Sequence, residues 1–291
     1  MATLKAIRRR IASVKSTQQI TRAMKLVAAA RLRRAQEALL AARPYHEALH
    51  RVASSILSIE GAALAAAEDA PPEALMLVIA SDRGLCGGYN ANLIRKAEEE
   101  ARRLRGDGLE THFFAVGRKA ADHFKRVGVT LAAESINHVP RLATFALARK
   151  LATRMLSDFR SGQIREAGIV YSQFRSALSQ RPVYARLLPV PVPAAEPDAL
   201  PAPAATRYLI EPSRAELMPI VLRRYVEGSI FQALLESEAS EHGARMTAMD
   251  NATNNASEMI ENLTLEMNRA RQATITKELM DIVGGAEALR A

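Results

Sequence analysis

Apolar residues recur three and four positions apart at the N-terminal end of the chain, which is the heptad pattern of a helix that buries one face. The apolar members of this first seam are Leu4, Ile7, Ile11, Val14, Ala28, Leu32, Ala35, Leu39 and Ala42. Gln18, Thr21 and Lys25 fall between them, and we interpret these three residues as an interruption. Because residues 3–60 contain no glycine and only one proline, Pro44, we predict one very long helix there.

The C-terminal end carries a second seam with the same alternation. Its members are Met246, Met249, Thr253, Ala256, Ile260, Leu263, Met267 and Ala270. Beyond Pro212 the only proline is Pro219, so we predict another very long helix. Either seam alone would fit an ordinary core helix. Because both helices are this long, winding them round each other is the simplest way to bury both seams, and we predict a long antiparallel coiled coil.

The middle of the chain has a different periodicity. Strand-like apolar runs and helical patterns alternate there, with strands expected at 74–80, 111–116 and 166–174 and helices at 91–105, 118–127 and 141–160. This β-α-β-α order predicts a parallel sheet flanked by helices, that is, a central Rossmann-like three-layer α/β domain. A further strand is expected from about Val183 to Leu188.

The fold class we predict is therefore α/β with an added antiparallel coiled coil, built from five parts. They are an N-terminal long helix (1–60), an α/β domain (74–190), a linker rich in proline and alanine (190–205), a final strand (206–211) and a C-terminal long helix (212–285).

Composition supports a helical protein with a polyanionic partner. Aromatic residues make up only 4% of the 291 residues and hydrophobic residues 48%, and this Ala-, Leu- and Arg-rich mixture favours long helices. The net charge of +9 fits nucleic acid, anionic lipid or an acidic protein surface, and does not choose between them. No apolar run is long enough to cross a bilayer, and the N-terminus lacks the apolar core of a secretory signal.

A glycine-rich turn, SDRGLCGGYN at residues 81–90, joins the first expected strand to a helix. A phosphate loop needs a lysine and a hydroxyl at fixed positions, and this turn supplies neither. Its glycines, Gly84, Gly87 and Gly88, also lack the spacing of a dinucleotide-binding turn. We interpret it as a tight turn whose glycines let helix and strand pack closely, without a nucleotide site.

Candidate catalytic and metal-binding residues are few. Cys86 lies near an expected helix N-terminus, which would lower its thiol pKa, but no histidine or aspartate stands at a spacing typical of a hydrolase, so we interpret it as structural. A single cysteine rules out an internal disulfide and favours a reducing compartment. We identify no HExxH motif, treat the six histidines as scattered, without a ligand pair, and predict no catalytic residue, no cofactor and no metal site.

The N-terminal helix begins as a cationic rod. Ten basic residues precede the first acidic residue, Glu37, and they are Lys5, Arg8, Arg9, Arg10, Lys15, Arg22, Lys25, Arg31, Arg33 and Arg34. Nucleic-acid binding would favour interleaved aromatic residues, and the first aromatic is Tyr45. A solvated face, or weak and salt-sensitive contact with an acidic protein surface, fits better.

Three stretches together carry a resemblance. IRRRIASVKSTQQITRAMKLVAAARLRRAQ near the start, SDRGLCGGYNANL in the middle and ARQATITKELMDIVGGAEAL in the tail are similar to the gamma subunit of F-type ATP synthases, in order and separation. The most specific part is Ile275-Thr276 followed by Glu278, Asp281 and Gly285-Ala286. The resemblance covers the whole chain, although residues 105–205 match only in pattern.

The resemblance implies a central rotor shaft with no chemistry of its own, which couples proton flow through a membrane ring to ATP synthesis. The terminal helices would form the shaft, and the middle domain would bind no nucleotide. Coupling contacts to the catalytic subunits are expected at Met24, Lys25, Glu241, Arg245, Arg271, Gln272 and Thr276. Contacts of the foot with the membrane ring are expected at Tyr208 and Glu211.

The resemblance also implies the partners and the location. The expected partners are the alpha, beta, epsilon and delta subunits and the membrane c ring, with one copy of this chain per complex and no nucleic acid. The chain lacks the cysteine pair of chloroplast relatives, so we expect no thiol switch. Without a transit peptide, a bacterial complex is expected, peripheral on the cytoplasmic side of the plasma (inner) membrane.

Two other classes of function stay open at this point. One is a dinucleotide-dependent enzyme built on residues 75–190, which would bind ATP or NAD in the isolated chain. The other is a basic coiled-coil protein that binds nucleic acid, whose affinity for duplex DNA would fall steeply with salt.

Overall fold

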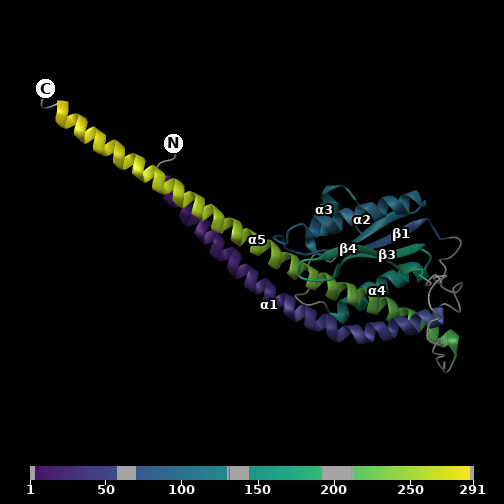
Figure 1. Cartoon of the computed structure of the whole chain (residues 1–291). Coiled ribbons are helices and arrows are strands. Elements are labelled where there is room, and N and C mark those ends of the chain that lie inside the picture. The colour runs from purple at the N-terminus through teal and green to yellow at the C-terminus, as the bar shows by residue number, and fades with distance from the viewer. Residues whose placement is uncertain are drawn as a thin grey trace, which may run out of the picture. The chain divides into compact units, whose positions relative to one another are not determined.

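The computed structural model describes residues 4–57, 70–129, 131, 144–191, 211 and 213–288 (Figure 1). Contacts between residues divide the chain into two compact units, which are residues 1–28 with 246–291 and residues 29–245. The two units are therefore described separately. Most of the expected linker 190–205 and all but Glu211 of the expected strand 206–211 lie outside the described residues.

The first unit consists of the start of helix α1 (Leu4–Leu57) and the end of helix α5 (Arg214–Ala288). α1 is 54 residues long and α5 is 75 residues long. The prediction of a very long helix at each end of the chain is confirmed. Within this unit α5 continues past the N-terminal end of α1 (Figure 1).

The second unit contains a four-stranded sheet and the remaining helices. Its further elements are β1 (Glu73–Ile79), α2 (Tyr89–Gly106), β2 (Glu110–Val116), α3 (Arg118–Arg126), α4 (Phe145–Arg160), β3 (Glu166–Phe174) and β4 (Gln180–Leu188). The three strands and three helices expected from the sequence are confirmed, with ends that shift by up to four residues. The class of the fold, a mixed α/β unit with a very long C-terminal helix, is thus as predicted.

The strands follow the order β2-β1-β3-β4. β1 pairs in parallel with both neighbours, so that Leu77 lies opposite Phe114 of β2 and Ile169 of β3. β4 pairs with β3 in the antiparallel sense, which the prediction of a parallel sheet missed. The reason is the short connection, residues 175–179, which can reverse the chain but cannot form a parallel crossover.

Alternate residues of β1 enter two separate apolar clusters, as the two faces of a strand require. Leu75, Leu77 and Ile79 pack in a cluster with α4 and with the part of α5 around Ile230. Met76 and Val78 pack in the other cluster, with α2 and α3. Figure 1 shows α2 and α3 on one face of the sheet and α4 on the other. Both faces of the sheet are therefore covered, and β1 is buried along nearly its whole length.

Two glycines of this unit are fixed by their neighbours. Gly117 has a φ of 100°, and a Cβ atom at this position would overlap the carbonyl oxygen of Ala80. A Cβ atom at Gly168 on β3 would overlap the ring of Tyr184 on β4. Only a residue without a side chain fits at Gly117, whereas at Gly168 a larger residue would force the Tyr184 ring to move.

We expect Gly117→Ala to lower the free energy of unfolding by about 3 kcal/mol, because the added methyl combines backbone strain with overlap. Urea unfolding of the full chain measures this loss. The matched control is Gly106→Ala at the end of α2, where a Cβ atom would meet nothing within 4 Å. Equal stability of the two variants would contradict the role assigned to Gly117.

Candidate functional site

Three polar side-chain contacts join α1 to α5 in the unit made of residues 4–28 and 246–288. With the donor first, they are Gln18 Nε2 to Ser257 Oγ (2.7 Å), Thr253 Oγ1 to Thr21 Oγ1 (2.8 Å) and Lys25 Nζ to Asp250 Oδ1 (2.6 Å). The residue number falls on α5 as it rises on α1, so the two helices run in opposite directions here. Our interpretation of Gln18, Thr21 and Lys25 as an interruption is wrong, because these residues continue the seam with hydrogen bonds in place of apolar contacts.

The rest of this seam is apolar. Its buried members are Ile7 and Ala28 on α1 and, one heptad apart, Met249, Ala256 and Leu263 on α5. Lys25 and Asp250 remain about two-fifths exposed, so their ion pair contributes only about 0.5 kcal/mol. The polar contacts therefore fix which residues face each other more than they hold the helices together.

The two residues expected to couple from α1 lie at this seam. Met24 is half-buried, and Lys25 is held by Asp250 rather than free. Since both are partly exposed, each also presents atoms to the outside of the helix pair. Their role as coupling contacts stays a prediction.

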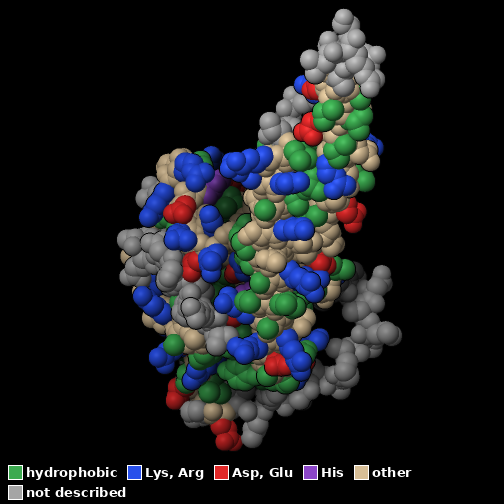
Figure 2. Space-filling model, turned by 90° about the vertical axis from the view of Figure 1, so that its left-hand side faces the viewer, with side chains coloured by type: hydrophobic (Ala, Val, Ile, Leu, Met, Phe, Trp, Pro, Cys, Tyr) green, Lys and Arg blue, Asp and Glu red, His purple; other side chains and the backbone are tan. Residues whose placement is uncertain are grey.

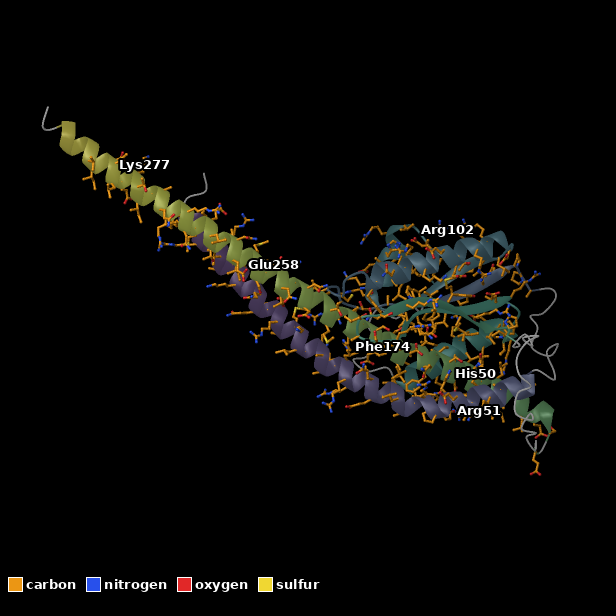
Figure 3. All side chains as sticks on the ribbon, viewed as in Figure 1. His50, Arg51, Arg102, Phe174, Glu258 and Lys277 are labelled. Atoms are coloured by element: carbon orange, nitrogen blue, oxygen red, sulfur yellow. The ribbon has the colours of Figure 1, made fainter. Side chains whose placement is uncertain are left out.

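The last part of α5 is exposed on every side. Every residue from 271 to 283 is exposed, including Arg271, Gln272 and Thr276. Figure 3 shows Lys277 on the section of α5 that continues past the start of α1. The exposed apolar side chains in this section are Ile275, Leu279, Met280, Ile282 and Val283. Sequence reasoning missed this apolar group, although the run of apolar residues after Ala270 is a readable signal. An exposed patch of this kind marks a surface that a partner covers.

Glu241 and Arg245 lie in the other unit, against the glycine-rich turn. Arg245 donates to Glu241 Oε1 at 2.7 Å and to the carbonyl oxygens of Arg83 and Gly84 at 3.4 and 3.3 Å. Burial raises the pKa of Glu241, and the guanidinium of Arg245 offsets part of that rise. These two side chains on α5 hold the glycine-rich turn in place. Their role as coupling contacts stays a prediction.

The three glycines of the turn differ from one another. A Cβ atom at Gly84 would lie 3.9 Å from Lys119 Cε, an ordinary contact distance, so our interpretation of close packing does not hold there. A Cβ atom at Gly88 would lie 3.3 Å from the side-chain nitrogen of Asn92, which is a tight contact. Gly87 has a φ of 57°, a left-handed backbone conformation that favours glycine.

The turn also presents the wrong groups for a phosphate. Carbonyl oxygens of Arg83 and Gly84 face the guanidinium of Arg245, and the amide of Ser81 is taken by Asn90 Oδ1 at 3.0 Å. A phosphate cradle needs free amides that point outward. This side of the turn therefore binds the guanidinium group of Arg245 instead of an anion.

Cys86 is buried beneath the turn, at 2% exposure. Burial raises the pKa of its thiol, and the nearby Arg245 and a hydrogen bond with Ser81 only partly offset this. Our expectation that the helix N-terminus lowers this pKa is wrong, because desolvation outweighs it. The interpretation of Cys86 as structural agrees with its burial.

His242, next to Glu241 on α5, is also buried. Burial, together with the positive charges of Arg245 and Arg31, lowers its pKa to about 4. Its Nδ1 lies 3.5 Å from the guanidinium of Arg245. The imidazole is therefore neutral at pH 7.

The treatment of the histidines as scattered is wrong for two of them, and the statement that the sequence has no HExxH motif is wrong too, because residues 46–50 match it. His46 and His50 stand four residues apart on α1, and their ring centroids are 6.3 Å apart. The spacing is local and visible in the sequence, so it was available as a signal. No group of three or more His, Cys, Asp or Glu that could hold a metal ion occurs within the described part of the chain.

The structure describes only one of the two residues expected at the foot. Tyr208 lies outside the described residues, and Glu211 is described and exposed.

The basic residues of α1 are mostly exposed, and Figure 2 shows Lys and Arg side chains spread over the face it displays rather than gathered in one patch. A scattered positive surface fits weak contacts better than a nucleic-acid groove. Over the residues that the structure covers, no helix has the length and apolarity needed to span a membrane.

A family model described as ATP synthase matches residues 3–289. Among curated proteins, the ATP synthase gamma chain of Pelotomaculum thermopropionicum is 46% identical over 99% of this chain and 100% of that protein. The ATP synthase gamma chain of Moorella thermoacetica is also 46% identical, over 100% of both. The chain belongs to the ATP synthase gamma chain family.

Solved structures of ATP synthases share the fold of this gamma-family chain. A chain from the central stalk and c-ring of the Tetrahymena thermophila mitochondrial enzyme matches with a TM-score of 0.62 and 25% identity, over 80% of this chain and 99% of that one. A chain from the Euglena gracilis mitochondrial enzyme matches with a TM-score of 0.69 and 20% identity, over 98% of this chain and 94% of that one. The family model and the curated relatives confirm the resemblance identified in the sequence.

We expect Arg245→Met to loosen the glycine-rich turn, because it removes charged donors from two carbonyl oxygens. Hydrogen exchange of the Tyr89 amide, which donates to the Cys86 carbonyl, should become about tenfold faster. The control is Arg33→Met, which removes only an exposed ion pair with Glu37. If hydrogen exchange of the Tyr89 amide is unchanged in Arg245→Met, Arg245 does not hold the turn in place.

We expect His242 to make the chain less stable in acid. Its folded pKa, about 4, lies below the ordinary value of 6.5, so its contribution is present above pH 6.5 and is lost as the pH falls toward 4. The loss amounts to up to about 3 kcal/mol. Urea unfolding at pH 7 and pH 4 should show a smaller acid loss in His242→Gln than in the unmodified chain, and equal losses would refute this account.

Proposed function

We propose that this chain is the central rotor shaft of an F-type ATP synthase and performs no bond chemistry itself. The observation that carries the proposal is the match to gamma chains at 46% identity, over 99–100% of this chain and 100% of each of those proteins. The proposed work is to carry rotation from a proton-driven membrane ring to the catalytic beta subunits.

In this proposal residues 4–28 of α1 and the facing part of α5 form an antiparallel coiled coil. Support comes from the polar contacts that join residues of opposite order and from the buried residues at heptad spacing. The second unit is then a Rossmann-like α/β domain that has kept the sheet and lost the phosphate site. Support for that loss comes from the carbonyl oxygens of Arg83 and Gly84, which accept from Arg245.

The shaft works through its lack of threefold symmetry. Two helices of unequal length present different side chains in each direction, and three catalytic subunits around them meet three different faces. A ligand or partner shifts a two-state equilibrium only by its differential affinity, and moving it from 1:99 to 99:1 takes about 5.5 kcal/mol. Many weak, unequal contacts along the shaft can supply this difference and still permit rotation.

The exposed end of α5 is the proposed contact with the catalytic ring. Apolar side chains such as Ile275 and Leu279 can slide on an apolar sleeve, because such contacts have no preferred direction. Arg271, Gln272 and Thr276 add polar contacts to a loop of one catalytic subunit at a time. Met24 and Lys25 add contacts from α1 at another level of the shaft, where Lys25 faces Asp250.

The remaining proposed contacts lie with the second unit and its surroundings. Glu241 and Arg245 act by holding the glycine-rich turn in the shape that meets a catalytic subunit. Tyr208 and Glu211 meet the c ring, and the epsilon subunit binds beside them. The alpha and delta subunits complete the assembly, which holds one copy of this chain on the inner face of a bacterial plasma membrane.

The proposal is tested by reconstitution. Vesicles that carry all other subunits should make ATP from a proton gradient only when the purified chain is added. Equal synthesis without the chain would overturn the proposal, and micromolar binding of ATP or NAD to the chain alone would favour the enzyme alternative instead.

The double variant Arg271→Ala/Gln272→Ala should reduce this coupled synthesis about tenfold, because it removes charged and polar contacts to the ring. Its thermal unfolding should not change, since both side chains are exposed. Arg126→Ala on α3, which removes an equally exposed cation elsewhere, is the matched control. Full activity of the double variant would exclude these two residues from coupling.

A further inference from the structure

Residues 46–50 of α1 read His-Glu-Ala-Leu-His. On a helix, side chains four positions apart lie on the same face, one turn above the other. This spacing of two histidines is the one that helical zinc sites use. The structure bears out the shared face, with the two ring centroids 6.3 Å apart and the ring planes tilted by 50°.

We propose that His46 and His50 bind one divalent transition-metal ion of the Cu²⁺, Ni²⁺ or Zn²⁺ kind. Imidazole nitrogen is a ligand that these ions prefer, whereas Mg²⁺ and Ca²⁺ prefer oxygen. The site goes beyond the rotor function, which uses neither histidine.

The two rings must move for both imidazoles to bind one ion. Metal–nitrogen bonds are about 2.0–2.1 Å long, so the rings must approach by about 1 Å from their separation in the structure. His50 is exposed, and Tyr225, whose ring centroid lies 5.9 Å away, packs beside it. Figure 3 shows His50 and Arg51 next to each other on α1.

The proposed site binds a metal ion but does not catalyse hydrolysis. Glu47, which stands where a metallopeptidase has its general base, is bound by Arg43 at 2.8 Å. No third protein ligand of the His, Cys, Asp or Glu type joins the pair within the ranges that the structure describes. Water fills the other positions of the ion, so the affinity is that of a two-ligand site.

The test is a calorimetric titration of the full chain, without a histidine tag, with Ni²⁺. The decisive variant exchanges two neighbours, His50→Arg together with Arg51→His. It keeps composition and charge but turns the second imidazole about 100° around the helix, away from His46. We expect one Ni²⁺ site per chain, and affinity at least about tenfold weaker in the exchange variant.

Further variants separate the site from general effects. His46→Gln should weaken Ni²⁺ binding like the exchange variant, His112→Gln on β2 should leave it unchanged, and Mg²⁺ should not bind. Circular dichroism confirms that each variant is folded. No saturable binding at millimolar Ni²⁺, or equal binding by the unmodified chain and the exchange variant, would overturn the proposal and leave the rotor function untouched.

Discussion

The pairing of two helix ends that lie more than 220 positions apart in the sequence is the constraint on which the first unit depends. Alanine and threonine at the seam bring little apolar area, so burial alone would allow the helices to slide by a heptad. Gln18, Thr21 and Lys25 oppose this, since each has one partner on α5, and a slip by a heptad would break all three contacts. Specific alignment is thereby obtained from contacts that are individually weak. A shaft that must hold its alignment while partners press on it from several sides needs this combination.

Much of the fold could be predicted from local periodicity. Short apolar runs located β1, β2 and β3, and the scarcity of glycine and proline located α1 and most of α5, because these signals act within a few residues. The direction of β4 could not be read in this way, since periodicity is the same for parallel and antiparallel strands. Gly117 and Gly168 were equally invisible, because the atoms that exclude a side chain there belong to Ala80 and Tyr184.

The candidate site was predicted less well, and for two different reasons. Gln18, Thr21 and Lys25 look like a break in an apolar pattern until their partners on α5 are known, and those partners carry no local signal. Arg245 is similar, since its two carbonyl acceptors lie more than 160 positions away. His46 and His50 are a different case. Their spacing was present in five consecutive letters, and counting histidines without measuring the intervals between them missed it.

The burial of Cys86 under a braced turn has a practical side. It is the only cysteine in the chain, and its thiol is both hidden and hard to ionise. A cysteine introduced on the outer surface of α5 would therefore react with a maleimide dye or a biotin far faster than the native thiol. A single dye can therefore be attached to the chain without first replacing Cys86. Rotation could then be observed in molecules that differ from the natural chain by one side chain.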